Sequence, residues 1–382
     1  MLQKFALGGL CGLLIAVVIT ISSGHGFLIT AAQRTYLDGN ITANINDHRA
    51  FHTREIKTAR PAELPRSGAF GETALSPEFK HRLTKYGTAA FLVLRDGAVL
   101  SEDYFNGYDA RSRTNSFSMA KTVVTLLLGI AIEEGLITGL NQKIVDYLPE
   151  FSADPLGKNA TIAHLTKMTS GYEWVEHYYS PISPTVELLY GPDVTEFLLS
   201  RHFSAEPGTF WEYSSASTQL LGIILQRALQ AQGAAETLSD YLSTRIWQPL
   251  QMNDDALWHT DDVGMELAFC CMNSNARNFA KLGMLMLNGG RWGNRQIVPT
   301  EFITQMIQPQ GTDYYGLSTW LSPDSQPAYY WFSGHLGQYV ICIPEHNMVI
   351  VRLGESRDDA TDFRTEELPQ YVAQAMRLAR LD

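Results

Sequence analysis

Two side chains in the first third of the chain have the types and the spacing of a catalytic pair. Ser118 and Lys121 stand three residues apart, directly before an uncharged apolar run over 122–132. On a helix this spacing places both side chains on one face, one turn apart. A lysine in a dry pocket has a lowered pKa and can take the proton that keeps a serine hydroxyl inert. The pair predicts a nucleophilic serine with a lysine base, beside helix N–H groups that can stabilise an oxyanion.

Two later motifs offer further polar groups. Tyr213 lies in FWEYSS (210–215), before a helical pattern over 217–230. Near a cationic lysine its phenol is easier to ionise and can pass a proton to a leaving group, although packing beside Trp211 would also explain it. His335 lies in SGHLGQ (333–338), which enters an apolar strand whose glycines let a ligand approach the strand edge. A structural turn histidine is the alternative there.

The pattern of apolar residues predicts the elements that position these groups. Strands are expected over 89–94 and 98–105, joined by the turn pair Asp96-Gly97, and over 315–320, 328–332, 338–343 and 348–353. Helices are expected over 77–86, 122–132, 162–168, 194–201, 217–230, 238–247, 273–288 and 367–380. This order predicts an α+β fold over 76–382, an antiparallel sheet flanked by helices, with a helical insertion over about 138–255.

The N-terminal 32 residues predict export. Lys4 precedes an uncharged run over 5–21, and a second apolar patch follows over 27–32. The run is long for a cleaved signal peptide and short for a full span, so cleavage and a retained hydrophobic anchor helix both stay open, with the anchor favoured. The body is expected on the exported, extracytoplasmic side, tethered to the membrane by this segment. Residues 33–75 are polar, with no sustained period, and are interpreted as a linker.

Composition excludes several classes of function. Among the 382 residues, 29 Lys and Arg against 40 Asp and Glu give a net charge of −11, which disfavours nucleic acid as a partner. The ten histidines are scattered without a zinc-type spacing, so no metal and no cofactor is expected. No Gly-x-Ser-x-Gly elbow of an α/β-hydrolase is present. A bridge from Cys270 or Cys271 to Cys342 and buried free thiols both stay open.

The three motifs in this order resemble the serine β-lactamase and penicillin-binding superfamily, in its class C-like branch of esterases, D-aminopeptidases and 6-aminohexanoate-dimer hydrolases. The resemblance covers most of the chain and extends to MTSGYEW (168–174), YSSASTQLLGIIL (213–225), ARNFAKLGMLMLNGGRWGNRQIVP (276–299) and GHLGQYVICIPEHNMVIVRLGE (334–355). It implies the fold of that superfamily and a small-molecule substrate attacked through an acyl-enzyme; it leaves the oligomeric state open.

Carried over motif by motif, the resemblance implies a role for each site residue. Ser118 is the acylated nucleophile, Lys121 its base and Tyr213 the partner acid/base. Backbone N–H groups of Ser118 and Gln338 form the oxyanion hole. Three further residues, which stand at the substrate-binding motif positions, are expected to contact substrate: Ser215, His335 and Gly337.

Departures from the antibiotic-hydrolysing members point to an ester or a linear amide. His335-Leu336-Gly337 stands where those enzymes carry Lys-Thr-Gly or Lys-Ser-Gly, so a lysine and a hydroxyl for a β-lactam carboxylate are absent. Ser215 replaces the usual asparagine. Loop 171–184 is expected either to cover an apolar acyl chain or to pack as ordinary loop aromatics, with the side chains Tyr172, Trp174, Tyr178 and Tyr179. The alternatives are a D-aminopeptidase, carboxypeptidase or β-lactamase, and a membrane-tethered sensor without turnover.

Overall fold

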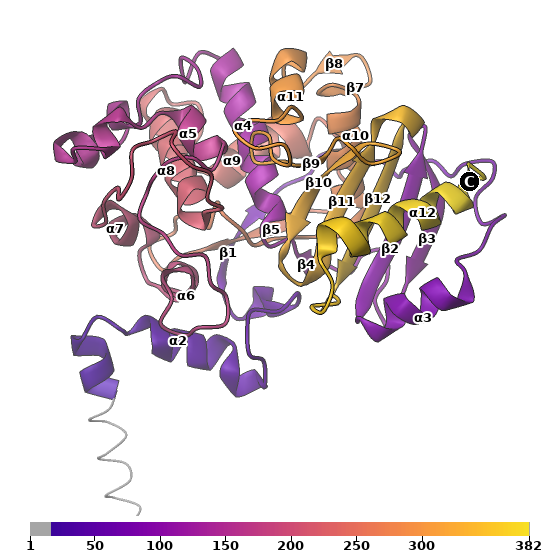
Figure 1. The fold of residues 1–382 in the computed structure, drawn as a ribbon, viewed down its shortest axis with the longest axis horizontal. Coiled ribbons are helices and arrows are strands. Elements are labelled where there is room, and N and C mark those ends of the chain that lie inside the picture. The colour runs from indigo at the N-terminus through magenta and orange to yellow at the C-terminus, as the bar shows by residue number, and fades with distance from the viewer. Residues whose placement is uncertain (1–16, 382) are drawn as a thin grey trace, which may run out of the picture.

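The computed structural model describes residues 17–381 and has a mixed α and β architecture (Figure 1). Its main sheet is antiparallel throughout, with the strand order β3-β2-β12-β11-β10-β9. The strands are β2 (Thr88–Arg95), β3 (Ala98–Tyr104), β9 (Trp320–Ser322), β10 (Tyr329–Gly334), β11 (Gln338–Ile343) and β12 (Met348–Gly354). The sheet joins strands from both ends of the chain, as the sequence predicted for this α+β fold.

Helices cover both faces of this sheet. α3 (Pro77–Lys85) and α12 (Leu368–Leu378) lie across one face (Figure 1). Phe79, Phe91 and Tyr371 pack together there. α4 (Met119–Glu133) and α10 (Ala276–Leu287) pack against the other face. Residues 122–131 of α4 are all buried, which explains the uncharged run in this part of the helix.

The helical half lies beside the sheet and carries most of the segment predicted as an insertion. Its helices are α5 (Ile162–Thr166), α6 (Pro184–Tyr190), α7 (Val194–Leu199), α8 (Ser215–Ala231) and α9 (Leu238–Leu242), which a π-turn extends over Ser243–Trp247. A second sheet, in the order β1-β5-β6-β4, joins the halves through β1 (His52–Ile56), β4 (Thr114–Asn115), β5 (Ala256–Thr260) and β6 (Met272–Ser274). The ribbon β7 (Arg291–Trp292) and β8 (Arg295–Gln296) precedes α11 (Thr300–Met306).

The segment 33–75, predicted as a linker, instead folds onto the body. β1 pairs with β5, and Ile45 and Ile56 are fully buried. The preceding helix α2 (Phe27–Arg34) packs through Ala31 against Phe51 and the α6 residue Tyr190. The buried apolar residues of this segment fill separate gaps on the surface of the folded body, so they follow neither a helical nor a strand period. Periodicity in the sequence therefore could not reveal that the segment is folded.

Two further predictions concern a strand near residue 320 and the apolar N-terminal run. The strand predicted over 315–320 is wrong except at its last residue, since β9 begins at Trp320. Over 315–319 the chain turns instead: Gly316 packs closely against the Met306 carbonyl, and Ser318 takes a left-handed φ of +47°. The apolar run over 5–21 falls mostly on residues outside those the structure describes, and the anchor helix is not shown. Over residues 17–381, no helix combines the length and the apolar character needed to cross a membrane.

Candidate active site

Ser118 lies at the N-cap of α4, and two residues separate it from the short strand β4. Phe117 takes a left-handed φ of +45°, which turns the chain sharply from strand into helix. The Asn115 side chain holds this turn, because its Oδ1 accepts a hydrogen bond from the Phe117 N–H at 2.8 Å and its Nδ2 donates to Asp47 at 3.0 Å. The hydroxyl of Ser118 is thereby presented at the head of the buried helix.

Lys121 lies one turn further along α4 and is fully buried. Its Nζ donates to the Ser118 Oγ at 2.9 Å, to the Ser215 Oγ at 3.1 Å and to the Phe269 carbonyl at 2.9 Å. Burial lowers the pKa of Lys121 to about 8, against an opposing effect of the Glu176 charge. A neutral amine is therefore accessible near neutral pH within hydrogen-bond reach of a serine hydroxyl, which is the geometry of a general base.

Glu176 joins this cluster, although the sequence analysis did not single it out. Its carboxylate accepts hydrogen bonds from the Ser215 hydroxyl at 2.6 Å, the Ser215 N–H at 2.8 Å and the Trp174 indole N–H at 2.7 Å. Ser215 thus links the carboxylate to the lysine. The only sequence signal was an acidic residue within an aromatic-rich loop, since nothing local says which way its side chain points.

Tyr213 lies just before α8, with its ring 5.1 Å from the Lys121 ammonium nitrogen. Burial and the charge of Glu176 raise the pKa of Tyr213, while a hydrogen bond with Ser118 acts in the opposite direction. The structure therefore brings together the three residues expected from the motifs. The half-buried phenol is a neutral proton donor at physiological pH, held next to the nucleophile.

The corner between β10 and β11 lies against the nucleophile segment. Gly334 packs so closely on the Ser116 carbonyl that a Cβ would not fit. Gln338 begins β11, and its side chain is turned inward, donating to the carbonyls of His335 and Gly354. Gly337 takes a left-handed φ of +82° with the Arg352 side chain close by, so both features favour glycine.

Arg352 supports this corner from within the sheet and was also missed. It is fully buried in β12 and donates to five backbone or hydroxyl acceptors, among them the carbonyls of Leu336 and Gly337 at 2.9 and 2.8 Å. The sequence did carry a signal, because a lone charge in an otherwise apolar strand is seldom buried without a role.

His335 packs among aromatic rings. The centroid of its ring lies 4.8 Å from that of Tyr178 and 5.5 Å from that of Phe117. Burial, with a smaller effect of the Arg357 charge, lowers the pKa of His335 to about 4. The imidazole is neutral at physiological pH and supplies no cation to a bound carboxylate.

Ser118 borders two hollows with different linings. One is a mainly apolar cavity, lined by Tyr36, Ala43, Phe117, Val186, Leu189, Tyr190, Phe269 and the Cys270–Cys271 pair, with polar groups such as Thr42, Thr185 and Ser215. The other is an open groove, lined by Glu176, Tyr178, Trp211, Tyr213, Tyr314, Trp320, His335, Arg357, Phe363 and Arg364 among others. Tyr213 lines the groove and is absent from the cavity wall. Loop 171–184 supplies Tyr178 to both hollows, whereas Tyr172 is buried away from them in contact with Phe203.

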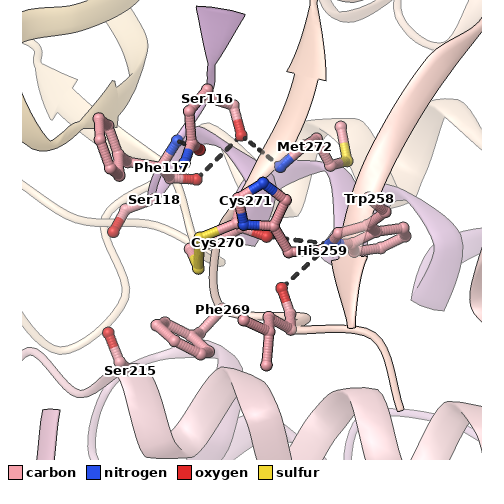
Figure 2. Close-up of a disulfide and its surroundings, with 12 residues drawn as sticks. Ser116, Phe117, Ser118, Ser215, Trp258, His259, Phe269, Cys270, Cys271 and Met272 are labelled. Atoms are coloured by element: carbon pink, nitrogen blue, oxygen red, sulfur yellow. Dashed lines mark hydrogen bonds between the residues drawn. A yellow bond between two sulfur atoms is a disulfide. The ribbon is translucent and has the colours of Figure 1, made fainter. Parts of the chain in front are cut away.

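The cysteine pairing differs from the bridge considered in the sequence analysis. Cys270 and Cys271 are bonded to each other, in the loop between β5 and β6 (Figure 2). Cys342 is a buried free thiol on β11, and its Sγ lies 3.6 Å from the Gly283 carbonyl of α10. A bridge to Cys342 is wrong because that side chain is packed between the sheet and α10. Over residues 17–381, no group of three or more His, Cys, Asp or Glu is placed to hold a metal ion.

Comparison with known proteins places this geometry in context. The family model described as Beta-lactamase matches residues 78–373. The 6-aminohexanoate-dimer hydrolase of Paenarthrobacter ureafaciens is 26% identical over 309 residues, which cover 75% of this chain and 77% of that protein.

Solved structures share the fold. A Bacillus anthracis protein, provisionally named a 6-aminohexanoate-dimer hydrolase, superposes with a TM-score of 0.74 at 22% identity, over 92% of this chain and 95% of that one. A family VIII carboxylesterase superposes with a TM-score of 0.60 at 18% identity, over 80% of this chain and 99% of that one. These similarities concern the arrangement of the chain rather than the chemistry of each residue.

Proposed function

The chain belongs to the beta-lactamase family, and from that premise we propose that it hydrolyses esters or linear amides through an acyl-enzyme on Ser118. The chain is a serine hydrolase of that family, and its relatives include amide and ester hydrolases. The observation that carries the proposal is the 2.9 Å hydrogen bond between Lys121 and Ser118, made by a lysine whose pKa is lowered to about 8.

The proposed mechanism uses these groups in sequence. The neutral amine of Lys121 takes the proton of Ser118 as its Oγ attacks the substrate carbonyl carbon. The N–H groups of Ser118 and Gln338 are proposed to hold the oxyanion. As the tetrahedral intermediate collapses, Tyr213 protonates the leaving alkoxide or amine and is reprotonated from Lys121. Water then attacks the acyl-enzyme with the proton transfers reversed, which frees the acid and restores Ser118.

The position of Tyr213 supports an orientation for the substrate. The group that protonates a leaving group must lie on the leaving-group side, and Tyr213 lines the groove. The acyl chain is therefore assigned to the cavity, whose walls are mainly apolar side chains and the disulfide. In this orientation Ser215 and His335 border the acyl side, and Gly337 shapes the corner beside it.

The first experiment tests the acyl-enzyme itself. A fluorophosphonate should label wild-type protein once, with the adduct mapped to Ser118 by mass spectrometry, and Ser118→Ala should neither be labelled nor turn over p-nitrophenyl esters. A label on another serine, or full activity of Ser118→Ala, would contradict the proposal. Stoichiometric acylation by substrate without later turnover would instead identify a sensor.

One observation favours the second candidate, an enzyme of penicillin-binding type that acts on anionic substrates. Arg357 lines the groove beside His335, and it is a cation that the motif comparison did not reveal. Its guanidinium lies 3.2 Å from the Asp359 carboxylate, which offsets part of its charge. We expect esters and linear amides to be turned over at least about tenfold better than nitrocefin in kcat/KM. Nitrocefin turnover that equals the best ester, and that Arg357→Ala abolishes, would establish the alternative.

We also propose that the protein works on the exported side of a membrane. The Cys270–Cys271 disulfide supports this, since disulfides persist mainly in oxidising compartments. Fractionation of a tagged chain expressed in its native cell would test the location; recovery in the cytosol would contradict it.

A further inference from the structure

The Cys270–Cys271 disulfide lies next to the catalytic pair. Both cysteines are buried, and both line the cavity that Ser118 also lines. Figure 2 shows the bonded sulfur atoms between the segment of Ser116 to Ser118 and the ring of Phe269. The residue directly before the disulfide, Phe269, supplies the carbonyl that accepts the 2.9 Å hydrogen bond from Lys121. The disulfide is therefore one residue away from a direct contact of the proposed base.

The loop around the disulfide is fixed at several points. The Trp258 indole N–H donates to the carbonyls of Leu267 and Cys270 at 3.0 and 2.9 Å, and the His259 N–H donates to the Cys271 carbonyl at 3.1 Å (Figure 2). Cys271 has a left-handed φ of +74°, a backbone conformation that residues other than glycine seldom adopt without support. The bond between neighbouring cysteines closes a small ring around their shared peptide and supplies such support.

We propose that the Cys270–Cys271 disulfide is a redox-sensitive positioning element, which sets the Phe269 carbonyl for Lys121, and that its reduction slows the reaction at Ser118. This inference rests on the proposed acyl-enzyme function but concerns a group to which that mechanism gives no part. The reductant is a dithiol. Two electrons from it break the S–S bond, two protons convert the sulfurs to thiols, and the dithiol becomes a disulfide.

The expected consequence follows from packing. Two thiols cannot stay at bonding distance, so their sulfur atoms must move apart within a wall that also contains Phe117 and Phe269. Without the ring, the backbone at Cys271 is free to leave its left-handed conformation. Either movement shifts the Phe269 carbonyl and weakens its hydrogen bond to Lys121, so the amine is held less well toward Ser118.

The test compares oxidised protein with protein reduced by dithiothreitol, at equal folded content by circular dichroism. Alkylation and intact mass confirm that two additional thiols have appeared. We expect fluorophosphonate labelling of Ser118 and kcat on a p-nitrophenyl ester both to fall by about tenfold or more, and both to recover on reoxidation. Because the lost carbonyl stabilised the ammonium form, the acidic limb of kcat/KM should also move to lower pH, which a merely structural role would not cause.

Variants keep the test decisive if reduction unfolds the protein. In Cys270→Ser/Cys271→Ser the two side chains keep nearly their size but cannot bond, and the left-handed φ of +74° at residue 271 loses the support of the ring. The reduced rate and no response to dithiothreitol are expected. The matched control Cys342→Ala removes the buried free thiol on β11 and should keep the wild-type rate and the dithiothreitol response.

Three outcomes would overturn the inference. The reduced protein could be labelled at Ser118 and hydrolyse the ester as fast as the oxidised protein. The double variant could have the wild-type kcat. The rate could also fall while the acidic limb of the kcat/KM profile stays at the same pH. Failure of the proposed function looks different: the oxidised protein then shows no labelling at Ser118, which removes the acyl-enzyme and with it this positioning role.

Discussion

Replacing Glu176 by glutamine should change the pH at which the enzyme becomes active. The carboxylate is linked to the Lys121 amine through Ser215, by hydrogen bonds of 2.6 and 3.1 Å. Its negative charge stabilises the ammonium form and so raises the pKa of Lys121, opposing the effect of burial. Glu176→Gln removes the charge and retains the size of the side chain, so the pKa of Lys121 should fall below about 8.

The size of the shift follows from the geometry. The two hydrogen bonds place the charges roughly 5 to 6 Å apart, where unit charges interact by about 3 kcal/mol at an effective dielectric constant of about 20. Glu176 is only half-buried, and solvent screening reduces this to about 1.5 kcal/mol, or about one pKa unit. Glutamine also has a single acceptor oxygen for three donors, which loosens Ser215 and should lower kcat by about tenfold.

The assay is the pH profile of kcat/KM on a p-nitrophenyl ester. The base acts as the neutral amine, so activity rises with pH through the pKa of Lys121, and the rise should occur about one unit lower in the variant. The matched control is Glu173→Gln in the same loop; the carboxylate of Glu173 is 45% exposed and pairs with Arg201, so its loss should leave the profile unchanged. A limb that stays in place or moves to higher pH in Glu176→Gln would refute the electrostatic link between Glu176 and Lys121.

Other perturbations follow from the same structure. Lys121→Ala and Tyr213→Phe should each lower kcat by about a hundredfold or more while KM changes less; near wild-type kcat on an unactivated amide would exclude the proton-transfer role of that residue. Arg352→Met should reduce the free energy of unfolding by about 3 kcal/mol in urea titration, since several buried carbonyls lose their donor, and an unchanged midpoint would count against that support. Burial raises the pKa of Asp47 to about 7, so its contribution to stability is present at acid pH and is lost as pH rises toward and through 7. This loss begins near the ordinary pKa of 3.8 and is complete just above 7. Asp47→Asn should therefore raise Tm by a few degrees at pH 8, by less at pH 5, and hardly at all at about pH 3.5, and the opposite pH trend would contradict this sign.

Much of the fold could be predicted from local patterns. The strands β2, β11 and β12 and the helices α4, α8 and α12 lie within a few residues of their predicted bounds, because each is a long segment of uniform apolar pattern. Elements made of a few residues were missed, among them β1, α6 and α11. Their existence depends on surfaces supplied by the rest of the chain, so their own sequences carry little signal.

Some residues of the candidate site could be predicted from the local sequence, and others could not. Ser118 and Lys121 are neighbours on one helix, so their spacing alone determined that they would meet, and the motif order predicted Tyr213. Glu176 and the Cys270–Cys271 bond reach the site from other parts of the chain.

The sequence by itself determined the nucleophile, its base and the sheet behind them, because helical period and strand alternation act over a few residues. Only the tertiary structure decided what surrounds the lysine. Its lowered pKa comes from burial, with opposition from a carboxylate more than fifty residues away along the chain. Burial and electrostatic coupling are sums over neighbours in space, and those neighbours are set only when every element has packed.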